Sequence, residues 1–218
     1  MFDPLDRILL AYPASFFRQV AEYTDAGFGE AWSLASRHAE EPERANMLGQ
    51  HRHARCESGF RHAAKDSGLS VLAPHTNPAG GRYSLVEGAG VYLIRSNIQR
   101  HCGTPRPTAF RQRWAELNAW LKPTQLDLLQ ATVKLSSNRL CGMLVITSHP
   151  RRGDQTVPAY VGLGISNPEL TDWVRLIAIN DLLALYHDAD AAARAPKEAP
   201  VEVKDVAMPR LKKKPDAG

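Results

Sequence analysis

The sequence has no hydrophobic run long enough to cross a membrane. No stretch of its 218 residues approaches the roughly 18 consecutive apolar residues of a transmembrane helix. The opening residues, Met1 to Pro4, lack the basic and then apolar order of a secretion signal. We therefore expect a cytoplasmic protein without a membrane span.

Cysteine is scarce, and its spacing argues against a domain stabilised by disulfide bonds or by a zinc ion. Cys56, Cys102 and Cys141 form an odd, widely spaced set without a Cys-x-x-Cys pair. Neither a disulfide framework nor a zinc ribbon is indicated by such a set. We expect three reduced thiols, and neither a metal nor another cofactor.

Acidic residues are almost missing from the middle of the chain. Residues 67–153 contain eleven Lys or Arg and three Asp or Glu, a local excess of +8, whereas the whole chain carries +4. A field concentrated on one third of a protein attracts polyanions or an acidic protein surface more than a uniform net charge would. This imbalance indicates the kind of partner, but it names no reaction.

The usual catalytic motifs are also missing. There is no Gly-x-Ser-x-Gly, and residues 162–166 (Gly-Leu-Gly-Ile-Ser) lack the third glycine and the lysine of a phosphate loop. We expect these two glycines to admit the last helix close to the sheet. His101 is poorly placed to activate Cys102, because adjacent residues on an extended chain point to opposite sides. Lys134 has no acid two residues before it, so the sequence does not support a metal-dependent nuclease.

Composition and periodicity predict an α+β fold. With 44% hydrophobic and 23% charged residues, the composition is that of a globular protein. We predict one α+β domain over residues 1–188, with a mainly antiparallel sheet of about five strands flanked by helices. Residues 189–218 turn to Ala, Pro, Lys, Glu and Asp and are predicted to be a disordered, flexible tail.

The amino-terminal third is predicted to be helical. Residues 1–40 suggest short helices, with a break at Gly27 and Gly29, which would form a helical cap or arm. A longer helix is predicted from Pro42 to about Asp66, because proline is tolerated in a first turn and Ser67-Gly68 offers a stop.

Residues 67–187 are predicted to form the sheet together with two helices. The expected strands are 82–86, 91–95, 131–135, 140–147 and 159–165, and 69–73 is a further, short candidate. Glu87 to Gly90 favours a hairpin turn, and the strand after it is apolar on both faces, which is typical of an interior strand. One helix should span 109–121 after a Thr108 cap. The other should start at Asn167-Pro168, a cap followed by a first-turn proline.

The arginines around residues 95–113 are the strongest candidates for a binding site. Five lie on one predicted loop and on the first turns of the helix that follows, where guanidinium groups suit phosphate oxygens. They are Arg95, Arg100, Arg106, Arg111 and Arg113. A ridge on the long helix, formed by Arg44, His51, Arg55 and His62, could extend this surface. The alternative is that these side chains pair with acids or keep a loop and a helix face solvated.

His53 and Cys56 fall on the opposite, apolar side of the long helix. A hydrogen-bonded core histidine is the interpretation that this placement favours, because no further ligand lies at a conventional spacing for a metal.

The leading hypothesis is a non-enzymatic bacterial accessory or regulatory protein that contacts nucleic acid through its basic middle. One alternative is an interaction module or inhibitor that binds an acidic protein partner, and another is a phosphodiester hydrolase. Acids clustered near the arginines would favour the enzyme, a broad basic face would favour binding, and an exposed apolar patch would favour a protein partner.

Overall fold

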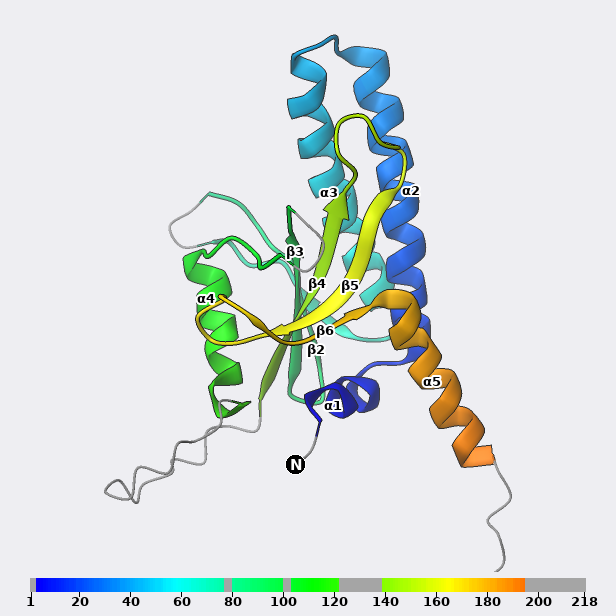
Figure 1. The fold of residues 1–218 in the computed structure, drawn as a ribbon, viewed down its shortest axis with the longest axis vertical. Helices are drawn as coiled ribbons and strands as arrows, with labels where there is room; N and C mark the ends of the chain where they lie inside the picture. The colour runs from blue at the N-terminus through cyan, green and yellow to red at the C-terminus, as the bar shows by residue number, and fades with distance from the viewer. Residues whose placement is uncertain (1–2, 77–79, 100–102, 122–138, 195–218) are drawn as a thin grey trace, which may run out of the picture.

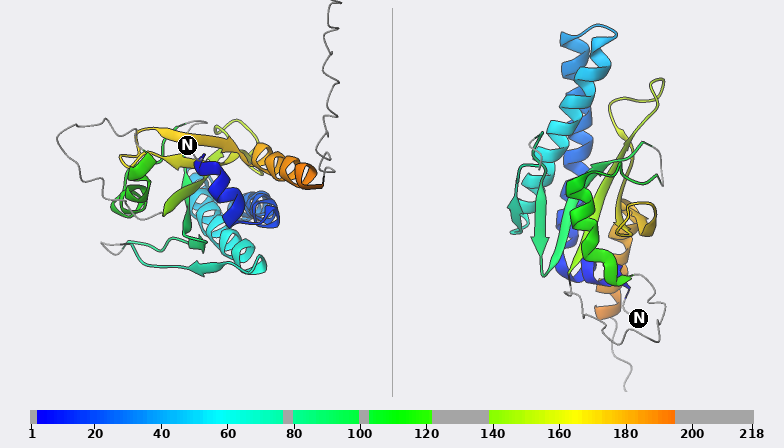
Figure 2. Two further views of the ribbon diagram at one scale, coloured as in Figure 1. Left: turned by 90° about the horizontal axis from the view of Figure 1, so that it is seen from below. Right: turned by 90° about the vertical axis from the view of Figure 1, so that its left-hand side faces the viewer.

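The computed structural model describes residues 3–76, 80–99, 103–121 and 139–194, and it shows a six-stranded sheet with helices on both faces (Figures 1 and 2). The strands are β1 (Ser70–Leu72), β2 (Leu85–Gly88), β3 (Val91–Asn97), β4 (Leu140–Ser148), β5 (Pro158–Ser166) and β6 (Trp173–Ala178). The helices are α1 (Pro4–Ala11), α2 (Ala14–His38), α3 (Glu43–Asp66), α4 (Ala109–Ala115), the 3₁₀ helix η1 (Glu116–Leu121) and α5 (Ile179–Arg194).

The strands lie in the sheet in chain order, and every neighbouring pair is antiparallel except β3 and β4, which are parallel. The predicted α+β class is therefore confirmed, with six strands where about five were expected. The strand predicted at 131–135 and the tail beyond Arg194 lie outside the described residues. No helix in the described part of the chain is both long and apolar enough to span a membrane.

The helices α2 and α3 pack side by side and form a long helical hairpin, whose tip projects beyond the sheet (Figure 1). The predicted break at Gly27 and Gly29 is wrong, because α2 runs through both residues to His38. A Cβ atom on Gly27 would lie 3.1 Å from the Cβ of Arg55 in α3, so this glycine allows the two helices to pack closely. The prediction of a long helix from Pro42 to about Asp66 is confirmed to within one residue.

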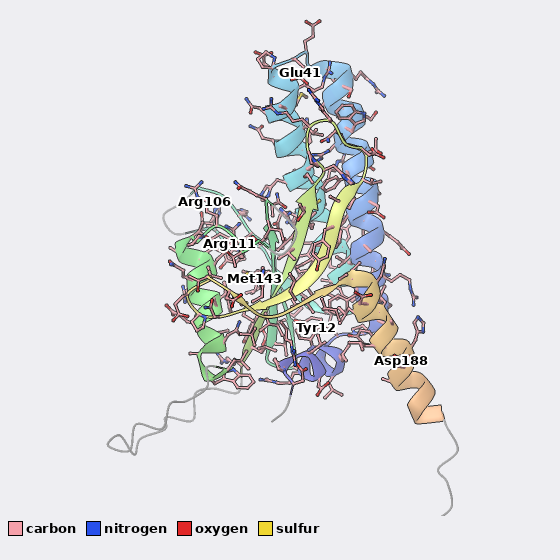
Figure 3. All side chains as sticks on the ribbon, in the orientation of Figure 1. Tyr12, Glu41, Arg106, Arg111, Met143 and Asp188 are labelled. Atoms are coloured by element: carbon pink, nitrogen blue, oxygen red, sulfur yellow. The ribbon has the colours of Figure 1, made fainter. Side chains whose placement is uncertain are left out.

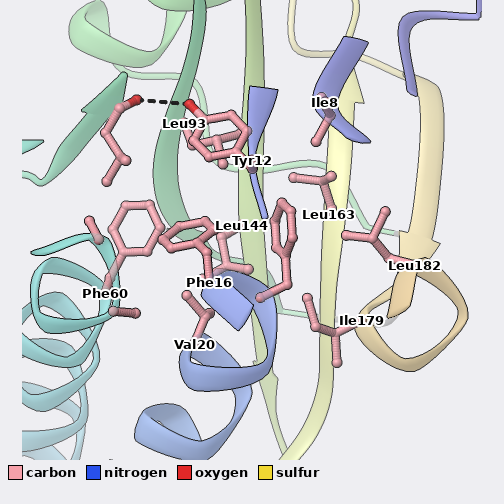
Figure 4. Close-up of a cluster of buried hydrophobic side chains, with 14 of the residues drawn as sticks. Ile8, Tyr12, Phe16, Val20, Phe60, Leu93, Leu144, Leu163, Ile179 and Leu182 are labelled. Atoms are coloured by element: carbon pink, nitrogen blue, oxygen red, sulfur yellow. Dashed lines mark hydrogen bonds between the residues drawn. The ribbon is translucent and has the colours of Figure 1, made fainter. Parts of the chain in front are cut away.

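The core has two parts, one on each face of the sheet. On one face, α1, α2, α3 and α5 cover side chains such as Leu93, Leu144 and Leu163 (Figure 4). The hydroxyl group of the buried Tyr12 donates to the carbonyl oxygen of Val91 at 2.7 Å, which ties the link between α1 and α2 to the sheet. On the other face, α4 and η1 pack over a second cluster that includes Met143.

A two-residue turn joins β2 to β3. Gly88 pairs with Val91, and the two residues between them, Ala89 and Gly90, have φ angles of 47° and 78°. Two successive positive φ angles are typical of a type I′ turn, whose twist matches that of the flanking strands. The predicted β-hairpin of β2 and β3 is confirmed. The predicted interior position of β3 is also confirmed, because β3 lies between β2 and β4.

The predicted helix start at Asn167 is wrong. The Asn167 side chain accepts hydrogen bonds from the backbone N–H groups of Thr171 and Asp172, at 2.9 and 3.2 Å, and so closes a turn. Leu170 adopts a positive φ of 58° there and is buried. The chain then forms β6, and the helix begins only at Ile179. Pairing of this segment with β5 prevails over the local signal for a helix start.

The expectation for the two glycines of β5 is also corrected. A Cβ atom on Gly164 would lie 2.3 Å from the ring of Trp173, which belongs to the neighbouring strand β6. Gly164 therefore makes room for an aromatic ring within the sheet and not for the last helix.

Two glycines of α3 give a matched test of the helix packing. A Cβ atom on Gly59 would lie 2.7 Å from the Cβ of Tyr23 in α2, whereas one on Gly49 would meet nothing within 4 Å. We expect Gly59→Ala to lower the free energy of unfolding by about 1 to 3 kcal/mol through overpacking. Gly49→Ala should raise it by roughly 0.5 to 1 kcal/mol, because alanine favours helix. Urea unfolding followed by circular dichroism measures both, and equal effects of the two substitutions would contradict the close packing.

Candidate functional site

The site lies where β3 continues beyond its neighbour β2. The first pair between these strands is Leu85 with Ile94, so residues 95–97 are bonded to β4 on one side and to no strand on the other. Side chains alternate between the faces of a strand, and Arg95 follows Leu93 on the face that α3 covers. The core stripe of β3 thus ends in a buried arginine.

Glu57 of α3 pairs with this arginine. The Arg95 Nε atom donates to Glu57 Oε1 at 2.9 Å, and the two side chains are 2% and 7% exposed. The second carboxylate oxygen accepts from the backbone N–H of Ser84, also at 2.9 Å. A buried ion pair is tolerated only when its remaining hydrogen-bonding groups are satisfied, and these contacts meet that requirement.

Two further contacts fix the orientation of the Arg95 guanidinium group. Nη1 donates to Oδ1 of Asn97 at 2.6 Å, and Nη2 lies 2.7 Å from Nδ1 of His53. An arginine has no acceptor, so Nδ1 of His53 must accept this hydrogen bond and the ring is neutral with its proton on Nε2. Partial burial and the adjacent Arg95 lower the pKa of His53.

The placement of His53 corrects one prediction. His53 keeps much of its surface exposed at the edge of α3 and does not lie in the core, although its ring is partly shielded beside Arg95. Arg52 is buried instead, and Cys56 is buried as predicted. The Arg52 guanidinium group lies 4.5 Å from the ring centroid of Phe28 and donates to the side-chain oxygen of Gln155 at 3.0 Å. An arginine could take the buried position because its long side chain reaches these partners at the edge of the core.

Arg111 of α4 adds a second, uncompensated cation. Its Nη1 atom donates to the backbone oxygen of Arg106 at 2.9 Å, and its guanidinium carbon lies 5.0 Å from the Phe110 ring centroid. The Nε atom is buried without a hydrogen-bond partner among the described residues. Burial lowers the pKa of Arg111, and the nearby Arg95 lowers it further. Figure 3 shows Arg106 and Arg111 together at one end of α4.

These side chains surround a hollow of about 250 Å³, which we call the Arg95 hollow. It is lined by His53, Glu57, Thr76, Gly80, Gly81, Arg82, Tyr83, Arg95, Asn97, Phe110 and Arg111. Glu57 is the single acidic residue in this lining, as far as the described residues show, and it is already paired. A neighbouring hollow of about 430 Å³ shares Asn97 and is lined by Arg106.

The structure brings some of the predicted site residues together and separates others. Arg95 and Arg111 line the Arg95 hollow, Arg106 lines its neighbour, and Arg113 is exposed on α4 but lines neither. Arg100 lies outside the described residues. Arg82 was missed, although its place in the basic third of the sequence was a signal. Glu57 was missed because an acid on a helix carries no mark of burial.

The predicted ridge on α3 does not face the Arg95 hollow. Arg55 pairs with Glu30 of α2 at 3.0 Å, and His62 packs its ring against Tyr23 of α2. Arg44 donates to the backbone oxygen of Ala39 near the hairpin tip. These residues therefore follow the side of α3 that packs against α2.

A second basic hollow, of about 530 Å³, lies between the hairpin and the loop 149–157 that joins β4 to β5. Its lining is Trp32, Glu41, Arg44, Ala45, Asn46, Leu48, Arg52, His149, Arg151 and Gln155. We call it the hairpin hollow. The hydrogen bonds between Arg52 and Gln155 attach this loop to α3.

The described thiols are unsuited to nucleophilic chemistry. Cys56 and Cys141 are both buried, and burial raises the pKa of each above its ordinary value. In the described ranges, no group of three or more His, Cys, Asp or Glu side chains is placed to hold a metal ion.

Comparisons with known proteins add no family to this geometry. No protein-family model matches the sequence, and neither the curated proteins nor the solved structures gave a significant match. The function must therefore be argued from the site itself.

The buried pair predicts a large difference between two glutamates. Glu57→Gln removes the charge opposite the buried Arg95 and should lower the free energy of unfolding by about 3 kcal/mol. Glu30→Gln breaks the pair with Arg55, in which the Glu30 side chain is 55% exposed and the Arg55 side chain is 50% exposed. This change should lower the free energy of unfolding by less than about 1 kcal/mol. Urea unfolding at neutral pH measures both. Similar losses would mean that the Glu57 pair is not buried in solution.

The neutral state of His53 predicts how stability depends on pH. Because the folded pKa of His53 lies below the unfolded value of about 6.5, the unfolded chain binds more protons near that pH. The free energy of unfolding should therefore fall as the pH is lowered from 7.5 to 5.5. His53→Asn keeps an acceptor but does not titrate, so its stability should fall less over the same range. Parallel curves for the two proteins would contradict the assignment.

Proposed function

We propose that the protein is a non-enzymatic accessory or regulatory protein that binds nucleic acid through the basic face around the Arg95 hollow. This face consists of Arg82, Arg106 and Arg111, with Arg95 at its floor and Arg113 alongside on α4. Its notable property is unpaired positive charge: the lining of the Arg95 hollow contains three arginines and one carboxylate. The observation that carries the proposal is Arg111, a partly buried cation without a carboxylate partner among the described residues.

Physical chemistry favours a polyanion as the compensating ligand. A cation removed from water without a partner is costly, and a phosphate oxygen would supply both the charge and the hydrogen-bond acceptor that Arg111 Nε lacks. Nucleic acids present such oxygens at regular intervals, and arginine forks are well suited to bind them. The thiols expected to remain reduced fit the cytoplasmic location that forms part of this proposal.

A second candidate is an acidic protein partner bound at the hairpin hollow. Its lining combines Arg44 and Arg151 with Trp32, and both arginine and tryptophan are enriched among the residues that contribute most to binding at the centres of protein interfaces. Glu41 is the sole acid of that lining within the described residues. A phosphodiester hydrolase is not proposed, because nothing in the described geometry favours it.

A charge-matched comparison tests the nucleic-acid proposal. The triple variant Arg82→Ala, Arg106→Ala, Arg111→Ala should bind duplex DNA or RNA more weakly, and its salt dependence should flatten by about 0.9 in log–log slope per lost phosphate contact. The control variant Arg18→Ala, Arg37→Ala, Lys65→Ala removes the same charge from exposed positions on α2 and α3. Fluorescence anisotropy at several salt concentrations measures both slopes.

The controls decide between the candidates. Equal weakening by both triple variants would show that only net charge matters and would contradict a defined face. Binding of an acidic polypeptide that persists in the first variant and is lost in Arg44→Ala, Arg151→Ala would favour the protein partner at the hairpin hollow.

A further inference from the structure

The Arg95 hollow differs from an ordinary basic surface because it is a small concavity lined from four directions. His53 and Glu57 come from α3, Arg95 and Asn97 from β3, and Phe110 and Arg111 from α4. Thr76 and residues 80–83 supply the fourth side. Its volume of about 250 Å³ falls just below the range of about 300 to 1,000 Å³ that is typical of sites for drug-sized molecules. It therefore suits one small charged group better than a continuous chain that passes through.

The charge of the hollow selects the kind of anion. Arg82, Arg95 and Arg111 contribute three positive charges, and the Glu57 carboxylate contributes one negative charge, so the lining carries an excess of +2 with His53 neutral. A phosphodiester within a strand carries one negative charge. A phosphate monoester carries between about 1.5 and 2 near neutral pH and presents three terminal oxygens. The monoester is the better match in both charge and acceptors.

The cations are held in place before any ligand arrives. The Glu57, Asn97 and His53 contacts fix the plane of the Arg95 guanidinium group at the floor. The Arg106 carbonyl oxygen and the Phe110 ring hold Arg111 on the wall. Such preorganisation reduces the entropy lost on binding and favours a ligand of defined geometry.

An aromatic pair lines the same hollow. The rings of Tyr83 and Phe110 stack with their centroids 4.5 Å apart, and both residues are half-buried and part of the lining. The indole N–H of Trp114 donates to the Tyr83 hydroxyl oxygen at 3.1 Å and fixes this ring. An aromatic surface beside a cationic hollow suits the sugar or base that is attached to a bound phosphate.

We propose that the Arg95 hollow binds the terminal phosphate monoester of a nucleic-acid strand, with Arg111 as the main recognising group. The proposal rests on the proposed function for the identity of the polymer, and it adds that the protein recognises strand ends and not only the backbone. A free mononucleotide carries the same chemical group and is the other possible source.

The test compares oligonucleotides that differ in a single terminal group. A single-stranded 12-mer with a 5′-phosphate, the same 12-mer with a 3′-phosphate, and the 12-mer with hydroxyl groups at both ends compete with a labelled probe for the full chain at one salt concentration. At least one phosphorylated form should compete about tenfold better than the hydroxyl form, as expected for one or two additional charge-assisted contacts. Competition by adenosine monophosphate, compared with competition by adenosine, shows whether a free mononucleotide binds through its phosphate.

Two glutamine variants on α4 control for net charge. Arg111→Gln should reduce the affinity ratio of phosphorylated to hydroxyl oligonucleotide to about one, whereas Arg113→Gln, at an exposed position outside the hollow, should leave that ratio unchanged. Thermal melting checks that both variants fold. If the affinity ratio fell to about one in both variants, the hollow would not be the site that recognises the terminal phosphate.

The outcomes separate this inference from the proposed function. Equal binding of phosphorylated and hydroxyl oligonucleotides by the unmodified protein would overturn the inference and leave nucleic-acid binding intact. Binding of adenosine monophosphate that depends on Arg111, without binding of any oligonucleotide, would support the phosphate site. It would contradict the assignment of a nucleic-acid strand as the ligand. Absence of binding to every phosphate-bearing probe would overturn both.

Discussion

Glu57 and Arg95 form a charged pair at the boundary between the hydrophobic core and the hollow, and three segments of the chain are held by it. Glu57 belongs to α3, Arg95 to β3, and Ser84 enters through its backbone N–H just before β2. His53 and Asn97 complete the contacts of the guanidinium group. A buried pair of this kind is a weak source of stability but a strong constraint on geometry, because each partner is costly when left alone. The shape of the hollow follows from that constraint.

The same pair explains why the hollow keeps an excess of positive charge. The Glu57 carboxylate is used by Arg95 and Ser84, and Arg61 approaches it at 4.0 Å. The Glu57 charge also acts on Arg111 and raises its pKa, but burial and the charge of Arg95 outweigh this effect. The direct contacts of Arg111 are with a carbonyl oxygen and an aromatic ring. The protein thus neutralises the arginine at the floor and leaves the one on the wall for a ligand.

Local sequence patterns correctly predicted the elements in which the local preference agrees with the tertiary contacts. The long helix α3, the turn at Ala89 and Gly90 and the interior strand β3 all follow from caps, glycines and apolar runs. The helix expected at Asn167 failed because pairing with β5 outweighs a good local cap. Gly27 and Gly29 were interpreted as a break because sequence alone cannot show that α3 packs closely against Gly27.

The candidate site was only partly predictable for a related reason. The basic third of the chain identified Arg95, Arg106 and Arg111, since local charge is visible in the sequence. Which of these arginines finds an acid depends on contacts across 38 residues between Glu57 and Arg95. Burial of Arg52 and exposure of His53 depend on where α2 packs against α3. Such choices are made by tertiary packing, which periodicity on one helix does not reveal.

The projecting hairpin has a mechanical consequence. With 25 residues, α2 is about 37 Å long, and it is anchored at its base by the buried Phe16 and Phe17. A rotation of about 5° at that base would displace the tip of a rod of this length by about 3 Å. The amplitude grows with distance from the pivot, so the hollow beside Arg44 would change width more than the one beside His53. Such a rotation would therefore alter the hairpin hollow more than the Arg95 hollow, and the hydrogen bonds of Arg52 to Gln155 would oppose it.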